Sequence, residues 1–287
     1  MDRATLLDAM EKSPNFPKIP KELSDIINIL QEPQDAIIDD IVDRINLVEG
    51  LESMIIDFIN SEFFKAPKKV TSLKEAIVFL GMKTMQVIII ATIINYLFSN
   101  EGDRFGEYEK ESYLKHSIGT ALASISIAEW LGKDNKYELF AYGMLHDIGV
   151  VLYENCFPEL FGKIQEMISR GNHQIVAEKI VLGGLDHTDI GSWVCDKLNF
   201  PPNISDVVIS HHWPSKAKNQ NKMIYIINLG DYISTKYYEG FLMRINWKKP
   251  IKLRINNSLN IPEEVLEEVR LNLPKEVEKT LRLFKRF

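Results

Sequence analysis

Two ionisable side chains interrupt an apolar stretch near the middle of the chain. The segment AYGMLHDIGVVLY, residues 141–153, is apolar at nearly every position except His146 and Asp147. A buried charge is costly unless it is paired or holds a metal ion, so this pair in an apolar helix requires partners. The other histidines and carboxylates of the chain are the candidates for that role.

The histidines of the chain share one region. All six follow residue 105. We expect His116 to open an amphipathic helix, and the adjacent pair His211 and His212 to close another. In the segment LDHTDIGSWV, Asp186 is positioned as an N-cap, which places His187 in the first turn of a helix.

A second isolated carboxylate, Asp231, lies in the apolar segment YIINLGDYIST. Imidazole and carboxylate are the mixed nitrogen and oxygen ligands that first-row divalent metals favour. A carboxylate that bridges two ions would explain why Asp147 follows a histidine directly, since one helical turn would then serve both ions. His173 is left out, because we expect it in an exposed loop. We therefore predict one or two divalent transition-metal ions (Fe, Mn, Ni or Zn), with these ligands: His116, His146, Asp147, His187, His211, His212 and Asp231.

Composition and charge describe an ordinary globular protein. Hydrophobic residues make up 45% of the 287 residues and charged residues 26%, a balance typical of a chain with a substantial core. A formal net charge of −6 argues against general nucleic-acid binding, which depends on Lys and Arg neutralising phosphates. Nucleic acid stays a minor hypothesis, based on a basic tail that more often forms a solvated face: Arg244, Lys248, Lys249, Lys252, Arg254, Lys275, Lys279, Arg282, Lys285 and Arg286.

Three features predict a cytoplasmic protein with no membrane segment. The start, MDRATLLDAMEKS, carries acids where a secretory signal has basic and then apolar residues. The most hydrophobic run, residues 85–98, is shorter than the roughly 20 residues that a hydrocarbon core requires, so we expect a buried helix there. Cys156 and Cys195 lack CxxC spacing, which favours buried thiols in a reducing compartment.

Helical periodicity dominates the chain, and the alternation typical of strands is nearly absent, which predicts an all-α protein. The polar stretch SNEGDRFGEYEKES indicates a boundary between two lobes. We expect an N-terminal helical lobe at residues 1–105, a helical lobe with the metal site at residues 106–240, and a C-terminal helical extension at residues 241–287.

Several local expectations follow from individual residues. Thr71 or Ser72 should cap a helix, with Glu75 available for a capping box, and Gly81 should end that helix. Two short C-terminal helices should have Pro262 and Pro274 near their starts. We expect core packing by three aromatic residues, Trp130, Trp193 and Phe200. Close helix approaches are expected at three glycines: Gly143, Gly149 and Gly191.

The ordered motif H...HD...D of this chain resembles that of the HD superfamily of metal-dependent phosphohydrolases. The additional histidines resemble those of its dinuclear branch, which includes the HD-GYP phosphodiesterases. Over a longer span, from about residue 16 to residue 214, the chain is similar to the HDOD family, the HD-related output domains of bacterial signalling proteins. The similar segments are, in order, FPKIPKEL, FFKAPKKVTSLKEAIVFLGMKTMQ, YGMLHDIGVVLY and LGGLDHTDIGSWVCDKLNFPPNISDVVISHH.

This resemblance implies a multi-helix HD-type bundle with an additional N-terminal helical lobe. It also implies signal transduction through a protein partner, usually without demonstrated catalysis. HDIGV replaces the HDIGK of the phosphodiesterases, so Val150 stands where a Lys would hold a substrate phosphate, and HHWPSKAKNQNK lacks their GYP loop. Cyclic di-GMP hydrolysis is therefore not expected. Ser112 stands where trinuclear members carry a Glu, which limits the expectation to two ions.

Three functions from different classes stay open. We favour a regulatory, partner-binding module with a mono- or dinuclear metal centre. The alternative is a metal-dependent phosphohydrolase acting on an unidentified phosphoester or nucleotide. In that enzyme, a metal-activated water would attack phosphorus at the centre that contains Asp147. His187, or one of the tandem histidines His211 and His212, would assist the leaving group instead of binding metal. The third possibility is an adaptor whose HD residues bind nothing.

Overall fold

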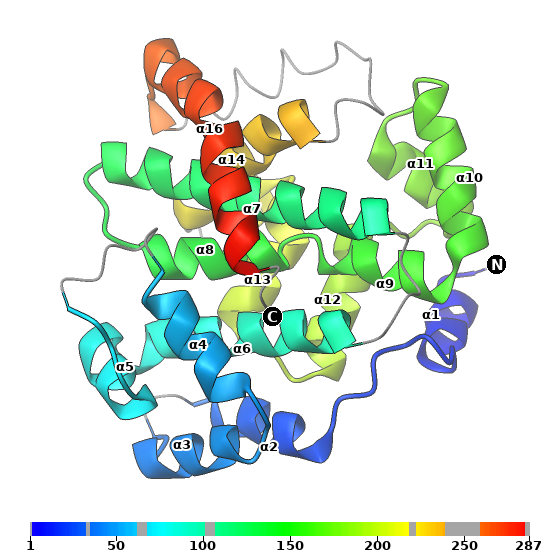
Figure 1. Cartoon of the computed structure of the whole chain (residues 1–287). Coiled ribbons are helices and arrows are strands. Elements are labelled where there is room, and N and C mark those ends of the chain that lie inside the picture. Colours follow the sequence, from blue (N-terminus) through cyan, green and yellow to red (C-terminus); the bar gives the residue numbers. More distant parts are fainter. Residues whose placement is uncertain are drawn as a thin grey trace.

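The computed structural model describes residues 2–32, 35–61, 68–100, 107–217, 222–238 and 259–284 (Figure 1). Within these ranges the regular elements are helices and no strand occurs, which confirms the all-α prediction. In chain order the helices are α1 (Arg3–Glu11), α2 (Lys21–Ile29), α3 (Ile38–Asn46), α4 (Leu51–Ile59), α5 (Leu73–Leu80), α6 (Met82–Asn100), α7 (Glu107–Trp130), α8 (Lys136–Leu145), α9 (Ile148–Cys156), α10 (Pro158–Ser169), α11 (Gln174–Val181), α12 (His187–Lys197), α13 (Pro202–Ser210), the 3-10 turn η1 (Pro214–Lys216), α14 (Lys222–Tyr238) and α16 (Glu263–Phe284).

Helices α2–α6 form a layer that packs on the rest of the molecule through α6 and α8. In α6, the described apolar side chains between Met85 and Ile94 are almost all buried, as expected for this hydrophobic run. No helix among the described residues is long and apolar enough to cross a membrane. The side chain of Ser72 caps α5 by accepting a hydrogen bond from the Glu75 backbone, and Gly81, with φ of 78°, ends this helix as predicted.

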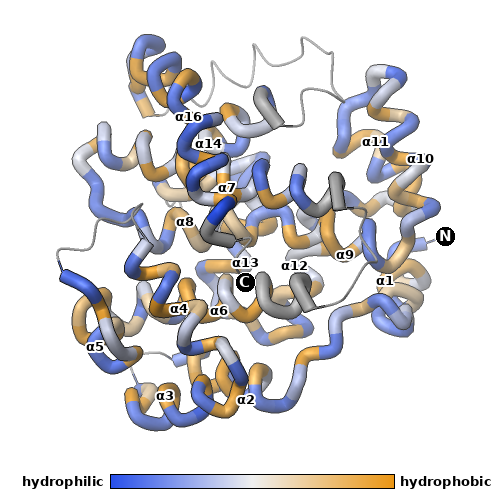
Figure 2. Tube along the Cα trace, viewed as in Figure 1, coloured by the Kyte–Doolittle hydropathy of each residue, from blue (hydrophilic) through white to orange (hydrophobic). Residues whose placement is uncertain are grey.

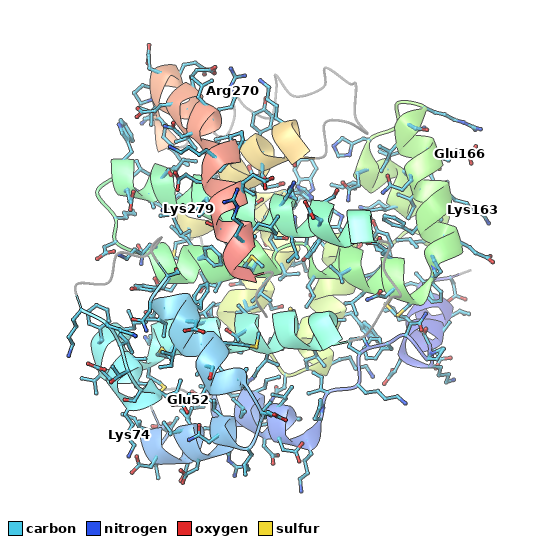
Figure 3. All side chains as sticks on the ribbon, viewed as in Figure 1. Glu52, Lys74, Lys163, Glu166, Arg270 and Lys279 are labelled. Atoms are coloured by element: carbon cyan, nitrogen blue, oxygen red, sulfur yellow. The ribbon has the colours of Figure 1, made fainter. Side chains whose placement is uncertain are left out.

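Helix α7 is the central element of the remaining helices. It packs against α8, α14 and α16, and its carbonyl at His116 accepts a hydrogen bond from the Ser234 hydroxyl of α14 at 2.7 Å. Hydrophobic and hydrophilic residues alternate along α16 (Figure 2), so one face can bury against α7 while the other stays in water. Charged residues of the outer helices, such as Lys163, Glu166 and Lys279, are exposed (Figure 3).

The expected break at Pro274 is wrong, because α16 runs through this residue as one helix. A proline inside a helix removes a hydrogen bond and costs about 3 kcal/mol. The apolar face of α16 nevertheless continues in register across the proline, and each buried Leu or Val contributes roughly 1.5–3 kcal/mol. Burial on α7 therefore outweighs the local cost, with five apolar residues buried: Leu266, Val269, Leu273, Val277 and Leu281.

The expectation of one continuous helix around His146 and Asp147 is also wrong. Helix α8 ends at Leu145, and α9 begins at Ile148. Successive residues of a helix point about 100° apart, so adjacent side chains on an unbroken helix could not easily reach one site. Because the helix is interrupted between α8 and α9, the side chains of His146 and Asp147 can both point toward the same site.

Two further local expectations need correction. His116 lies in the middle of α7 rather than at its start, because the helix already begins at Glu107. Trp130, at the end of that helix, is 46% exposed and does not pack in the core. Phe200 is buried, and Trp193 meets Phe16 edge to face at a centroid distance of 5.7 Å, as expected for packing residues.

The N-terminal helix α1 packs against elements that follow residue 106. Glu11 forms an ion pair with Lys197 of α12 at 2.8 Å, and the Asn15 side chain donates to the carbonyl of Asn155 in α9 at 3.0 Å. The division at residues 1–105, 106–240 and 241–287 stays a prediction. Most of the basic tail lies outside the described residues, including Arg244, Lys248, Lys249, Lys252, Arg254, Lys285 and Arg286.

Candidate metal centre

The structure brings all seven predicted ligand residues together at the centre of the molecule. They come from the middle of α7, the turn between α8 and α9, the start of α12, the end of α13 and the middle of α14. They fall into two groups whose potential ligand atoms lie within 4.8 Å of one another. The first cluster contains His116, His146 and Asp231, and the second contains Asp147, His187, His211 and His212.

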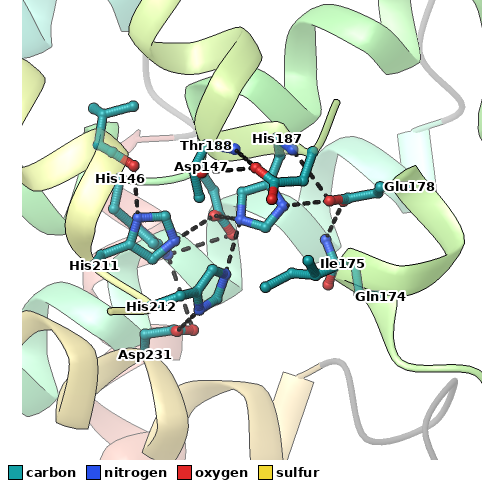
Figure 4. Close-up of polar contacts among 12 residues, drawn as sticks. His146, Asp147, Gln174, Ile175, Glu178, His187, Thr188, His211, His212 and Asp231 are labelled. Carbon is teal, nitrogen blue, oxygen red and sulfur yellow. Dashed lines mark hydrogen bonds and ion pairs between the residues drawn. The ribbon is translucent and has the colours of Figure 1, made fainter. Parts of the chain in front are cut away.

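Asp147 connects the two clusters. Its Oδ2 atom lies 3.3 Å from Nε2 of both His116 and His146. Its Oδ1 atom lies 3.3 Å from Nε2 of His211 and 3.5 Å from Nε2 of His187. Each oxygen of one carboxylate therefore faces a different pair of imidazoles; Figure 4 shows Asp147 beside His146, His187 and His211.

The remaining contacts close each cluster. In the first, the Nε2 atoms of His116 and His146 are 3.1 Å apart, and Asp231 Oδ1 lies 3.5 Å from Nε2 of His116. In the second, the Nε2 atoms of His187 and His212 are 2.8 Å apart. Asp231 Oδ2 also lies 3.6 Å from Nδ1 of His212, so this carboxylate faces both clusters.

The first histidine of the HD dipeptide and the first histidine of the HH dipeptide each cap the C-terminal end of a helix. His146 is the C-cap of α8 and His211 the C-cap of α13. The last carbonyls of a helix have no partner within it, so a side chain near the C-terminus can donate to them. His146 Nδ1 pairs with the Gly143 carbonyl at 2.7 Å, and His211 Nδ1 pairs with the Val208 carbonyl at 2.9 Å. The other ring nitrogen of each histidine then faces Asp147.

His187 occupies the opposite kind of helix end. Asp186 caps α12 by accepting hydrogen bonds from the backbones of Thr188 and Asp189, which confirms the predicted N-cap. His187 Nδ1 pairs with Glu178 Oε2 of α11 at 2.7 Å, and its backbone N–H donates to the same oxygen at 3.1 Å. Glu178 was not predicted from the sequence. It could have been, because it is a carboxylate within an apolar helical segment, near Ala177 and the buried Leu182, and the same kind of signal identified Asp231.

Close approaches of helices carry the ligands to one another. A methyl group added at Gly143 would lie 2.5 Å from the Ala121 backbone of α7, and one at Gly149 would lie 2.0 Å from the His187 carbonyl of α12. Gly191 meets a Val208 side chain of α13, so the three glycines mark close approaches as expected. Gly230, which directly precedes Asp231, does the same against Thr120 of α7, and sequence reasoning had not identified it.

The buried site is strongly polarised. Burial by itself raises the pKa of Asp147, but the charge of His146 and hydrogen bonds from neighbouring histidines reverse this effect and hold that pKa well below its usual range. Burial lowers the pKa of His211, and for His212 burial and the adjacent His211 together lower the pKa far below its usual value. For His187, burial is outweighed by the Glu178 carboxylate, which raises its pKa to about 10.

The donor set and its spacing fit metal ions. Ligand atoms about 2.1 Å from a common ion lie roughly 3.0–3.4 Å apart, and the contacts between donor atoms here range from 2.8 to 4.0 Å. Asp147 Oδ1 and His211 Nε2 are buried and face each other at 3.3 Å, but neither has a partner in good hydrogen-bond geometry among the described residues. Buried polar atoms normally find such a partner, and a metal ion would provide one for both. Imidazole-rich sites suit Zn, Fe or Ni, whereas Mg and Ca prefer oxygen ligands.

His173 is placed differently from its expected exposed loop. It is half-buried at the N-cap of α11, where its ring accepts a hydrogen bond from the Ile175 backbone at 3.2 Å. It is not part of either cluster. The two cysteines are free and buried, as expected.

Comparison with known proteins identifies the family. The HDOD domain matches residues 16–214. The chain belongs to the HDOD family. It is also similar to an uncharacterised protein of Treponema pallidum (strain Nichols), with 21% identity over 198 residues, which is 69% of this chain and 38% of that protein. The HDOD chain thus spans less than half the length of this curated relative.

Solved structures show the same HDOD fold. A candidate phosphohydrolase from Shewanella amazonensis SB2B superimposes with a TM-score of 0.70 at 20% identity, covering 99% of this chain and 98% of the other. An HDOD domain protein of unknown function from Geobacter sulfurreducens gives a TM-score of 0.63 at 20% identity, with 94% and 97% covered. A candidate signal transduction protein from Marinobacter aquaeolei VT8 gives a TM-score of 0.66 at 16% identity, and the match covers 99% of this chain and 65% of the other.

Proposed function

We propose that this HDOD protein is a regulatory module of signal transduction that binds a protein partner and contains a dinuclear metal centre. His116, His146 and Asp231 would hold one divalent ion, and His187, His211 and His212 would hold the other. Asp147 would serve both groups. The observation that carries this proposal is the Asp147 carboxylate, each oxygen of which faces a separate pair of imidazoles at 3.3–3.5 Å.

The enclosure of the site favours regulation over turnover. Within the described part of the chain, six of the seven ligand side chains are less than a tenth exposed, and only His212 reaches 25%. An enzyme that acts on phosphoesters needs an open position beside its metal ions. Ions enclosed in this way would instead tie together five separate elements of the fold. The similarity to the candidate signal transduction protein supports the same reading.

Metal occupancy would provide the regulatory step. The ligands belong to α7, the turn between α8 and α9, α12, α13 and α14, so the ions would bind only the packed arrangement of these helices. A ligand that binds one arrangement shifts the population toward it. A protein partner that recognises the surface of the packed helices would thereby respond to metal availability or to the redox state of the ions.

The alternative is a metal-dependent phosphohydrolase acting on an unidentified phosphoester or nucleotide. The complete H...HD...D set and the fold shared with the candidate phosphohydrolase favour it. Two divalent ions supply electrostatic stabilisation to a reacting phosphoryl group. Asp147 would orient the ions, and His187, if it is not a ligand, could hold a proton for the leaving group.

Elemental analysis tests the proposal. Protein purified without a histidine tag and reconstituted under reducing, anaerobic conditions should contain close to two equivalents of Fe, Mn, Ni or Zn. The Asp147→Ala variant should lose most of this metal, whereas Asp196→Asn, at an exposed position of α12, should retain it. Negligible metal in the wild type would refute the metal centre. Turnover of phosphomonoesters, phosphodiesters or nucleoside triphosphates that disappears in Asp147→Ala would favour the enzyme.

A further inference from the structure

We propose that Glu178 is a positioning residue for the second cluster, which fixes the ring of His187 and supplies a negative charge without binding the ion itself. This inference rests on the proposed metal centre. Glu178 lies in α11, nine residues before His187, and its side chain is fully buried.

Both oxygens of Glu178 are already occupied by donors. Oε2 accepts hydrogen bonds from the backbone and the Nδ1 atom of His187, at 3.1 and 2.7 Å. Oε1 accepts from the Tyr153 hydroxyl and from the Gln174 side chain, each at 2.9 Å. Figure 4 shows His187 lying between Glu178 and Asp147. The carboxylate therefore faces the far side of the ring and is not a ligand.

The position of His187 in its helix explains why this residue needs an external partner. His146 and His211 sit at the C-terminal ends of helices, where free carbonyls accept their Nδ1–H groups. At the N-terminal end of a helix the free groups are N–H donors, so no carbonyl is available to His187. Glu178 satisfies one of these backbone donors and the ring Nδ1–H with one oxygen. This leaves Nε2 of His187 directed at Asp147 and His212.

Charge balance gives Glu178 a second role. The first cluster contains the Asp231 carboxylate and shares Asp147, whereas the second contains three imidazoles, which carry no charge when they bind a metal ion, and shares Asp147. A divalent ion in the second cluster would thus have less negative charge among its ligands. A buried carboxylate hydrogen-bonded to a ligating histidine raises the basicity of that ligand, and removing such a partner typically weakens metal binding by about 10–100-fold.

Titration with Co²⁺ in competition with a chelator tests this inference. The visible absorption spectrum of bound Co²⁺ reports on each site. The His212→Ala variant identifies the bands of the second cluster, and the Asp231→Ala variant identifies those of the first. Glu178→Ala should weaken the affinity of the second cluster for Co²⁺ by about 10–100-fold and leave the affinity of the first within about threefold of the wild type. Glu178→Gln keeps an oxygen for His187 but removes the charge, so it should fall between the wild type and Glu178→Ala.

Tyr153→Phe is the matched control, because it removes a buried hydrogen bond to the other oxygen of Glu178 and leaves both bonds to His187. It should bind Co²⁺ at both sites with nearly wild-type affinity. Equal loss from both clusters in Glu178→Ala, or unchanged affinity at the second, would overturn the positioning role. Wild-type protein that binds no Co²⁺ would overturn the metal centre itself and, with it, this inference.

Discussion

Replacing Asp147 by alanine should remove the dependence of protein stability on metal. The carboxylate is nearly buried, and each of its oxygens faces two histidines. Its removal would leave the clusters without a shared ligand. The substitution also takes a counter-charge away from several buried imidazoles, so the variant should be less stable even without metal. The informative quantity is therefore the change in melting temperature on chelation, measured separately for each protein.

The size of this change follows from mass action. At a free metal concentration of one hundred times the dissociation constant, one ion stabilises the fold by about 2.7 kcal/mol, and two independent ions by about 5.4 kcal/mol. In a chain of this size, roughly 2 °C of melting temperature corresponds to 1 kcal/mol. Chelation should therefore lower the melting temperature of the wild type by about 10 °C, or by about 5 °C if one ion binds.

Calorimetry or circular dichroism of reconstituted protein, with and without chelator, measures this difference. Asp147→Ala should shift by less than about 2 °C, while Asp196→Asn, which changes an exposed carboxylate of the same helix as His187, should shift like the wild type. Equal responses of the wild type and Asp147→Ala to chelator would refute a metal clasp, even if the variant were less stable overall.

Three further predictions concern helix packing, substrate and pH. Gly149→Ala should lower the free energy of unfolding, measured in urea, by about 1–3 kcal/mol and should weaken metal binding at the second cluster. The reason is that its methyl group would lie 2.0 Å from the His187 carbonyl. Gly162→Ala has open space around the new methyl group and should have neither effect. Cyclic di-GMP hydrolysis, followed by chromatography, should be absent or very slow, since Val150 replaces the expected phosphate-holding Lys. Against the effect of burial, Glu178 raises the pKa of His187 to about 10, so a metal ion must displace its proton at neutral pH. Calorimetric affinity for the second ion should therefore rise with pH, by up to about tenfold per unit below that pKa, and an affinity independent of pH would contradict this assignment.

The residues that meet at the candidate site could be predicted because their types are unusual for their surroundings. Histidine and aspartate within apolar helical segments have few structural explanations, and Asp147 and Asp231 were both identified in this way. The N-cap at Asp186 was equally readable, since its side chain acts on the next three residues. These signals depend only on neighbouring residues in the sequence, so they can be recognised without knowing how the helices pack.

The break between α8 and α9 could not be predicted from the same information. Every residue around His146 and Asp147 is compatible with a helix, and no proline marks the interruption. The turn becomes favourable only when both side chains reach groups on other helices, such as His116 and His211. Pro274 shows the opposite case, in which a strong local signal is overridden by the apolar face that α16 buries on α7.

The positions of the ligands along their helices link metal binding to helix packing. Four of the seven candidate ligands, at His146, Asp147, His211 and His212, belong to two helix ends, where the chain changes direction. His187 begins α12, which approaches α9 at the contact between Gly149 and the His187 carbonyl. A small displacement of these ends alters several ligand distances at once, and packed helices shift between discrete arrangements rather than deforming continuously. An ion at this site would therefore select one arrangement of α8, α9, α12 and α13, which is the property required of a module that passes a signal to a partner.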